Sequence, residues 1–184
     1  MYTINTTIEG VAPFLFNRFT EESKSDIDKG TAGGKKSIQQ REVEVLVKVY
    51  RNDNGLYLPA QSMKKCLLVG ITMGKLKEGR SSARSFVEAT VFIHPQEIEF
   101  GKNEPDFIHE CMGRRPPKTG GACIIRRPGL KEGWELSFSL TVTDDRRDPE
   151  LLRRGMEEAG LLAGIGDWRP EFGRFIVKKW EVKK

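Results

Sequence analysis

The stretch "DPELLRRGMEEAGLLAGIGDWRPEFGRFIVKKWEV" (residues 148–182) decides the fold, because it predicts a helix, a glycine-rich turn and a strand in direct succession. Asp148 is a favourable helix N-cap, and Pro149 suits the first helical position. The apolar stripe of this predicted helix is Leu152, Met156, Ala159 and Ala163. Residues 171–182 then predict a closing strand, so the glycines join the last helix to the last strand.

Upstream of this stretch, the same two kinds of element alternate. Residues 2–11 ("YTINTTIEGV") alternate Ile with Thr and Asn, which predicts a half-buried opening strand. Residues 60–75 ("AQSMKKCLLVGITMGK") predict a helix with Met63, Leu67 and Ile71 on one side.

Three further strands are predicted between the helices. Residues 85–100 look like one strand interrupted at Pro95, which is tolerated only at an edge or a bulge. Residues 122–127 and 134–143 predict two strands around a turn. In the second of these, the inward-facing positions are Leu136, Phe138, Leu140 and Val142.

Apart from inserts, the order is strand, helix, strand, strand, helix, strand. It predicts an α+β, ferredoxin-like fold (RRM-like, split βαβ), an antiparallel sheet with two helices on one face. We expect one domain, 1–184, with a flexible loop at about residues 20–37 and a long, irregular, basic insertion at about residues 101–121. Residues 41–50 ("REVEVLVKVY") fit a strand or a helix face equally well, so this segment stays open.

Composition narrows the choice of partners and of compartment. The 184 residues include 31 Lys and Arg against 26 Asp and Glu, a net charge of +5 that weakly favours polyanionic partners. No apolar run approaches the roughly 18 residues that would span a membrane. The N-terminus lacks the pattern of a signal peptide, and three cysteines form no even disulfide framework, so we expect a cytoplasmic protein.

The glycine-rich turn "GIGDWRPEFGRF" (164–175) is the first candidate binding element. Glycines let backbone N–H groups converge on a phosphate, arginines add charge-assisted contacts, and aromatic rings stack on bases. The candidate nucleic-acid-binding residues here are Gly164, Gly166, Trp168, Arg169, Gly173 and Arg174. The alternative is that the glycines cap and turn the chain while Phe172 and Phe175 belong to the core. Asp167 is expected to be a turn acceptor or a partner for an arginine.

A second candidate cluster lies in the predicted insertions. Arg114, Arg115 and Lys118 lie in a segment with almost no apolar anchor, Arg126 and Arg127 follow on the next strand, and Lys35 and Lys36 lie in the first long loop. We expect them to neutralise phosphates, and the alternative is a solvated, charged loop surface.

The glycine-rich turn resembles that of the RAMP superfamily of CRISPR-associated proteins. Their loop reads G-x-G, a spacer of about five, then G-x-G, whereas this chain has a six-residue spacer (167–172) and Phe175 in place of the last glycine. Residues 56–70 ("LYLPAQSMKKCLLVG") also resemble the RAMP turn into the first helix. The ending is similar to that of small RAMP-like proteins of phages and mobile elements. The resemblance implies a ferredoxin-like, RNA-binding or RNA-processing protein whose basic inserts clamp the strand and whose copies line up along it.

Catalysis and cofactors receive little support. RAMP nucleases often rely on a histidine, which makes His94 and His109 weak catalytic candidates. The spacing of His109, Cys111 and Cys123 matches no zinc signature, so no metal and no cofactor are expected.

We therefore expect a non-catalytic protein that binds single-stranded nucleic acid, DNA or RNA, largely without regard to sequence. Its further partners would be its own copies, a larger ribonucleoprotein or a phage replication complex. The alternatives are a metal-independent CRISPR-type endoribonuclease and a phage structural or assembly protein.

Overall fold

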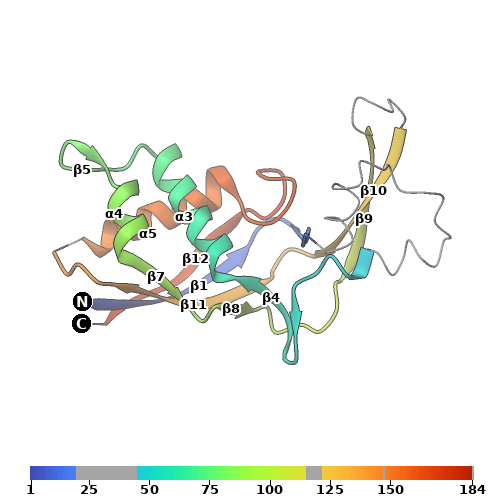
Figure 1. Ribbon diagram of the computed structural model, residues 1–184, viewed down its shortest axis with the longest axis horizontal. Coiled ribbons are helices and arrows are strands. Elements are labelled where there is room, and N and C mark those ends of the chain that lie inside the picture. The colour runs from blue at the N-terminus through green and yellow to red at the C-terminus, as the bar shows by residue number, and fades with distance from the viewer. Residues whose placement is uncertain (20–44, 115–121, 147, 184) are drawn as a thin grey trace.

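The computed structural model describes residues 1–19, 45–114, 122–146 and 148–183. Its main sheet has four antiparallel strands in the order β12-β1-β11-β7. They are β1 (Tyr2–Gly10), β7 (Val91–His94), β11 (Glu135–Val142) and β12 (Phe175–Lys183). The predicted mixed α+β class with antiparallel sheets is confirmed (Figure 1).

The helices pack on one side of this sheet (Figure 1). They are α3 (Ala60–Met73), α4 (Arg84–Thr90) and α5 (Pro149–Glu158), and α5 continues into one π-helical turn, η1 (Ala159–Ala163). The predicted N-cap is confirmed, because the Asp148 carboxylate accepts a hydrogen bond from the Glu150 N–H at 2.9 Å. None of the described helices is both long and apolar enough to cross a membrane.

The core forms where the sheet and the helices meet. Burial alternates along β1 and along β11, and Ile4 lies opposite Leu140 while Ile8 lies opposite Leu136. On α3, the predicted apolar side of Met63, Leu67 and Ile71 is fully buried. The apolar side chains at every second strand residue and at every fourth residue of α3 therefore pack together in one apolar layer.

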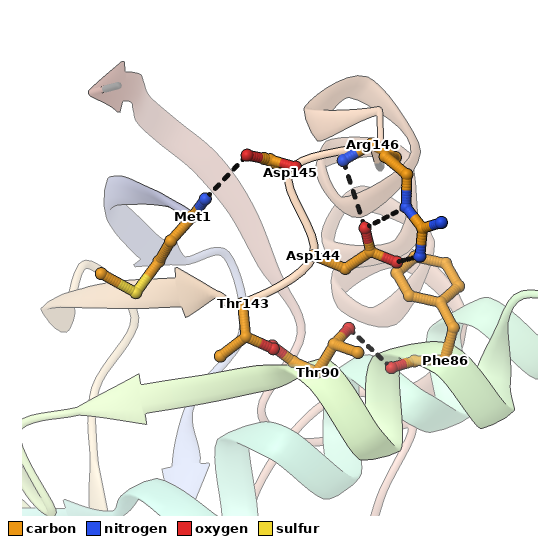
Figure 2. Close-up of polar contacts among 7 residues, drawn as sticks. All are labelled: Met1, Phe86, Thr90, Thr143, Asp144, Asp145 and Arg146. Carbon is orange, nitrogen blue, oxygen red and sulfur yellow. Dashed lines mark hydrogen bonds and ion pairs between the residues drawn. The ribbon is translucent and has the colours of Figure 1, made fainter.

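Polar contacts fasten the corner of the sheet near the N-terminus (Figure 2). The Met1 ammonium donates to the Asp145 carboxylate at 3.1 Å. Thr143, just after β11, donates its N–H at 3.0 Å and its hydroxyl at 3.2 Å to the Thr90 carbonyl. These contacts join the start of β1, the end of α4 and the β11–α5 turn.

A second sheet has the order β2-β10-β9, with β2 (Phe14–Leu15), β9 (Phe107–Arg114) and β10 (Ala122–Leu130). Two predictions are wrong here. The insertion at about 101–121 is not irregular throughout, because β9 is an eight-residue strand. Moreover, β10 pairs with β9 and β2 and not with β11. The resulting β9–β10 hairpin extends away from the main sheet, at the side opposite the termini (Figure 1).

The remaining strands are short. They are β3 (Arg51–Asn52), β4 (Gly55–Pro59) and β8 (Glu97–Glu99) in one sheet, and β5 (Lys77–Glu78) with β6 (Ser81–Ser82) in another. The single interrupted strand predicted for 85–100 is therefore wrong in its first half, which is α4. Val87 of α4 is fully buried by its neighbours, and this packing overrides the β propensity of the segment.

The ambiguous segment at residues 41–50 is described from Val45 onward. Val45 and Leu46 are helical and a turn follows, so the described part of residues 41–50 is not a strand. Val45 and Val49, four residues apart, are both buried, which is the helical spacing. The predicted loop at 20–37 lies outside the described residues.

Candidate nucleic-acid interface

The loop from Gly164 to Arg174 is fastened to the segment that contains β2. The Asp167 N–H donates to the Leu15 carbonyl at 2.9 Å, and the Gly173 N–H donates to the Pro13 carbonyl at 2.8 Å. The loop also closes on itself, because the Ile165 N–H donates to the Gly173 carbonyl at 2.9 Å. The result is a loop with a fixed path beside the base of the hairpin.

The glycines are needed for that path. Gly173 has a φ of +72°, and a Cβ at this position would lie 1.6 Å from the Ile165 carbonyl oxygen. Gly164 has a φ of +67° and ends the helical segment, its N–H bonded to the Ala159 carbonyl at 2.8 Å. Chain geometry alone therefore accounts for Gly164 and Gly173, and their predicted contact with phosphate stays a prediction.

Three rings connect the loop to the β9–β10 hairpin. The His109 ring of β9 lies edge-on to Trp168, with centroids 5.1 Å apart and planes at 89°. The ring centroid of Phe172 lies 5.0 Å from that of the same imidazole. His109, a weak catalytic candidate, is thus a packing partner of the loop. Phe175, by contrast, is buried, and its ring centroid lies 6.4 Å from that of Trp134. For this residue the alternative is confirmed: it belongs to the core.

An ion pair crosses the same junction. The Arg127 Nε of β10 donates to Asp167 Oδ2 at 2.7 Å, and the two side chains are 16% and 23% exposed. The prediction that Asp167 is the partner of an arginine is confirmed. The other arginine predicted on this strand, Arg126, pairs with Glu110 of β9 at 2.5 Å. Both charges predicted to meet phosphate are therefore partly neutralised within the protein.

The cations predicted on the glycine-rich loop differ from these two arginines. Arg169 and Arg174 are exposed, and among the described residues neither side chain has a hydrogen-bond or ion-pair partner. Arg114 is the last residue of β9. The remaining members of the second predicted cluster, Arg115, Lys118, Lys35 and Lys36, lie outside the described residues.

A cavity of about 210 Å³ lies between the loop, β2 and α3. Its buried apolar walls are Phe14, Leu15, Phe16, Leu58 and Ile165, each between 0% and 3% exposed. Its more accessible lining includes Asn17, Tyr50, Ser62, Lys65 and Arg169. A buried apolar wall with exposed cationic side chains in the same lining suits a ligand that is flat and apolar at one end and anionic at the other.

Sequence reasoning identified Arg169 and Gly166 but missed the other accessible side chains of this cavity. A signal was present for two of them. Ser62 and Lys65 lie three residues apart in the predicted helix 60–75, directly after the turn that resembles the RAMP pattern, and residues at this spacing share a helix face. Asn17 and Tyr50 carried no such signal.

Cys66 fixes α3 to the start of the loop. Its thiol donates to the Gly164 carbonyl at 3.3 Å, and burial raises the pKa of the thiol to about 12, against a smaller opposing effect of Arg169. The group is therefore protonated at neutral pH and is a hydrogen-bond donor, not a nucleophile.

The face of the main sheet opposite the helices has a different character. A shallow hollow of about 480 Å³ there is lined by residues of β1, β7, β11 and β12, among them His94. Its hydroxyl and amide groups are Asn5, Thr7, Ser137 and Ser139. These groups offer hydrogen bonds, and the exposed ring in this lining is that of His94. The glycine-rich loop and the hairpin bring together more rings, those of His109, Trp168 and Phe172, beside the exposed cations Arg169 and Arg174.

No protein-family model matches this chain, and no curated protein matches its sequence. Among solved structures, it is similar to a chain of the Type III-B Cmr-β complex, determined by cryo-electron microscopy with cognate target RNA bound. The TM-score is 0.61 at 14% identity, and the match covers 100% of this chain and 61% of that chain. This chain thus spans about three fifths of the length of its structural relative. At this identity the likeness shows a shared fold.

Proposed function

We propose that this chain binds single-stranded RNA without cleaving it, as a component of a ribonucleoprotein, along a surface that runs from the glycine-rich loop to the β9–β10 hairpin. The observation that carries the proposal is that two exposed cations, Lys65 and Arg169, line the same cavity. The neighbouring residue Trp168 contacts the His109 ring of the hairpin. Cations that neutralise phosphates and rings that stack on bases are the two components of sequence-independent binding to single strands.

The loop supplies two kinds of contact in this proposal. Arg169 and Arg174 neutralise phosphates. The backbone N–H groups of Gly166 and Arg169 have no hydrogen-bond partner in the part of the chain that the structure describes, so they are free to donate to phosphate oxygens. Trp168 is partly exposed and is the ring placed to stack on a base.

RNA is proposed in preference to DNA because the similar Cmr-β chain belongs to a complex that contains target RNA. Association with further protein chains is proposed on the same ground. The sheet order β12-β1-β11-β7 with its two crossover helices supports the finer assignment to the ferredoxin-like fold.

The test is fluorescence anisotropy with labelled single-stranded RNA and DNA of about 30 nucleotides, titrated over a range of salt concentrations. We expect RNA binding that weakens steeply with salt. Absence of binding to either polymer at low salt would overturn the proposal.

The same samples, run on a denaturing gel, separate binding from cleavage. Intact RNA after prolonged incubation is the expected result. Cleavage that disappears in His94→Ala or His109→Ala would replace the proposal with the endoribonuclease alternative.

A further inference from the structure

We propose that the cavity between the glycine-rich loop, β2 and α3 is a mononucleotide pocket. It would receive one nucleobase turned out of the strand, while the phosphate of that nucleotide lies between Lys65 and Arg169. This inference rests on the proposed function and goes beyond it, because it names a site where one nucleotide is enclosed.

The size and the walls of the cavity suit a single base. Its volume of about 210 Å³ is below the roughly 300–1,000 Å³ of pockets that take drug-sized ligands. The aromatic residues Phe14 and Phe16 form part of the buried wall, and Tyr50 supplies a further, partly exposed ring. Enclosure between aromatic and apolar side chains is how proteins hold a base removed from its stack.

The polar groups lie where the edge of a base would need them. Asn17 offers an amide donor and acceptor, and Ser62 offers a hydroxyl. Neither side chain has a hydrogen-bond partner among the residues that the structure describes. The Gly166 N–H, on the same cavity, is also free within that part of the chain. These groups are open to solvent in the free protein and are therefore available to hydrogen-bond the edge of a base.

The charges favour an attached phosphate. Lys65 and Arg169 are exposed cations on this cavity. Asp167 also lines it, but its carboxylate is held by Arg127 at 2.7 Å, which offsets the repulsion of an anion. The hollow on the sheet face lacks this combination, since its lining is mainly hydroxyl, amide and charged groups.

The experiment is a titration of the ¹⁵N-labelled full chain with adenosine 5′-monophosphate, adenosine and inorganic phosphate, followed by two-dimensional NMR. We expect saturable shifts of the amide signals of Asn17, Tyr50, Ser62 and Gly166 with the nucleotide. Adenosine should bind about tenfold more weakly, because it lacks the phosphate. Phosphate alone should leave the signal of Tyr50 unchanged.

Two variants and one control variant sharpen the test. Ser62→Phe fills the cavity and should abolish the saturable shifts, whereas Ser81→Phe, at an exposed position in β6, should retain them. Lys65→Ala should weaken the binding of the nucleotide and leave that of adenosine unchanged. This second variant keeps the test valid if Ser62→Phe does not fold.

Several outcomes would overturn the pocket. These are no saturable shift up to about 20 mM nucleotide, shifts confined to the sheet face, or equal binding by Ser62→Phe. If RNA still binds in the anisotropy experiment, the proposed function survives that failure. Conversely, nucleotide binding in the cavity without any RNA binding would support the pocket and overturn the wider function.

Discussion

Arg127 and Asp167 are 40 residues apart in the chain, yet the guanidinium Nε of the first lies 2.7 Å from the carboxylate of the second. Their ion pair joins strand β10 of the hairpin to the glycine-rich loop, beside the contact of His109 with Trp168. The hairpin and the loop are thereby held together as one unit, although they belong to different parts of the topology.

This ion pair should stabilise the fold measurably. We expect a coupling free energy of about 1 kcal/mol between Arg127→Ala and Asp167→Asn. This value is at the upper end of the range for exposed ion pairs, because both side chains of this pair are mostly covered. A double-mutant cycle by urea denaturation measures it. The control is the exposed pair Arg153 and Glu157, with an expected coupling of about 0.3–0.5 kcal/mol. Equal coupling in the two pairs would contradict the prediction.

The path of the loop depends on Gly173. Gly173→Ala should reduce the free energy of unfolding by about 3 kcal/mol or more, because the added Cβ would meet the Ile165 carbonyl oxygen at 1.6 Å. Gly133→Ala is the matched control, since Gly133 also has a positive φ, +85°, but has no atom within 4 Å of the added Cβ. We expect a loss of about 1 kcal/mol there. Similar losses for both variants in urea denaturation would show that the clash is relieved by movement of the loop.

The main sheet was predictable because its signals are local. The alternation in residues 2–10, the helical stripe of Met63, Leu67 and Ile71, and the Asp148 cap each follow from the physics of one element. The hairpin was not predictable in the same way. In β9, polar and apolar residues share each face, so the sequence lacks the alternation that predicts a strand. The extended conformation of this segment depends instead on its pairing with β10.

The site was only half predictable for a related reason. Arg169 and Gly166 stand in a conspicuous local motif, and sequence reasoning found them. The cavity beside them is assembled from the separate segments that contain Asn17, Tyr50 and Lys65. Such an arrangement depends on tertiary packing, which one sequence without its fold does not reveal. The ion pairs of Arg126 and Arg127 were hidden for the same reason.

The aromatic contacts of His109 should govern how firmly the hairpin is held. In His109→Ala, the amide hydrogens of β9 and β10 should exchange about tenfold faster, since aromatic pairs contribute roughly 0.5–1.5 kcal/mol beyond their buried area. The amides of β1 and β11 should be unaffected. Hydrogen exchange followed by mass spectrometry measures this, with His94→Ala as control because His94 is exposed on β7. Unchanged exchange in the hairpin would show that the ion pair suffices to hold it.

Stability should fall in alkaline solution because of Cys66. Its pKa is raised by burial to about 12 in the folded protein, so above about pH 9 the unfolded chain loses a proton that the native state keeps. The free energy of unfolding should then decrease with pH by up to about 1.4 kcal/mol per unit. The pKa of Tyr2, also raised to about 12, adds to the decrease above about pH 10. Urea titrations at several pH values between 8 and about 10 should give a flatter profile for Cys66→Ala, and an equally steep one would exclude this thiol as the cause.

The salt dependence of RNA binding should separate the cations that meet phosphate from those that do not. If Lys65 and Arg169 each neutralise one phosphate, Lys65→Ala and Arg169→Ala should each reduce the slope of log Kd against log salt by about 0.7, the value for single strands. Lys77→Ala removes an equal charge from β5 and should leave the slope unchanged. The slope is more informative than the affinity, because loss of net charge weakens attraction at long range in all three variants. An equal reduction in Lys77→Ala would mean that RNA senses only the overall charge of the protein and that the loop is not its binding surface.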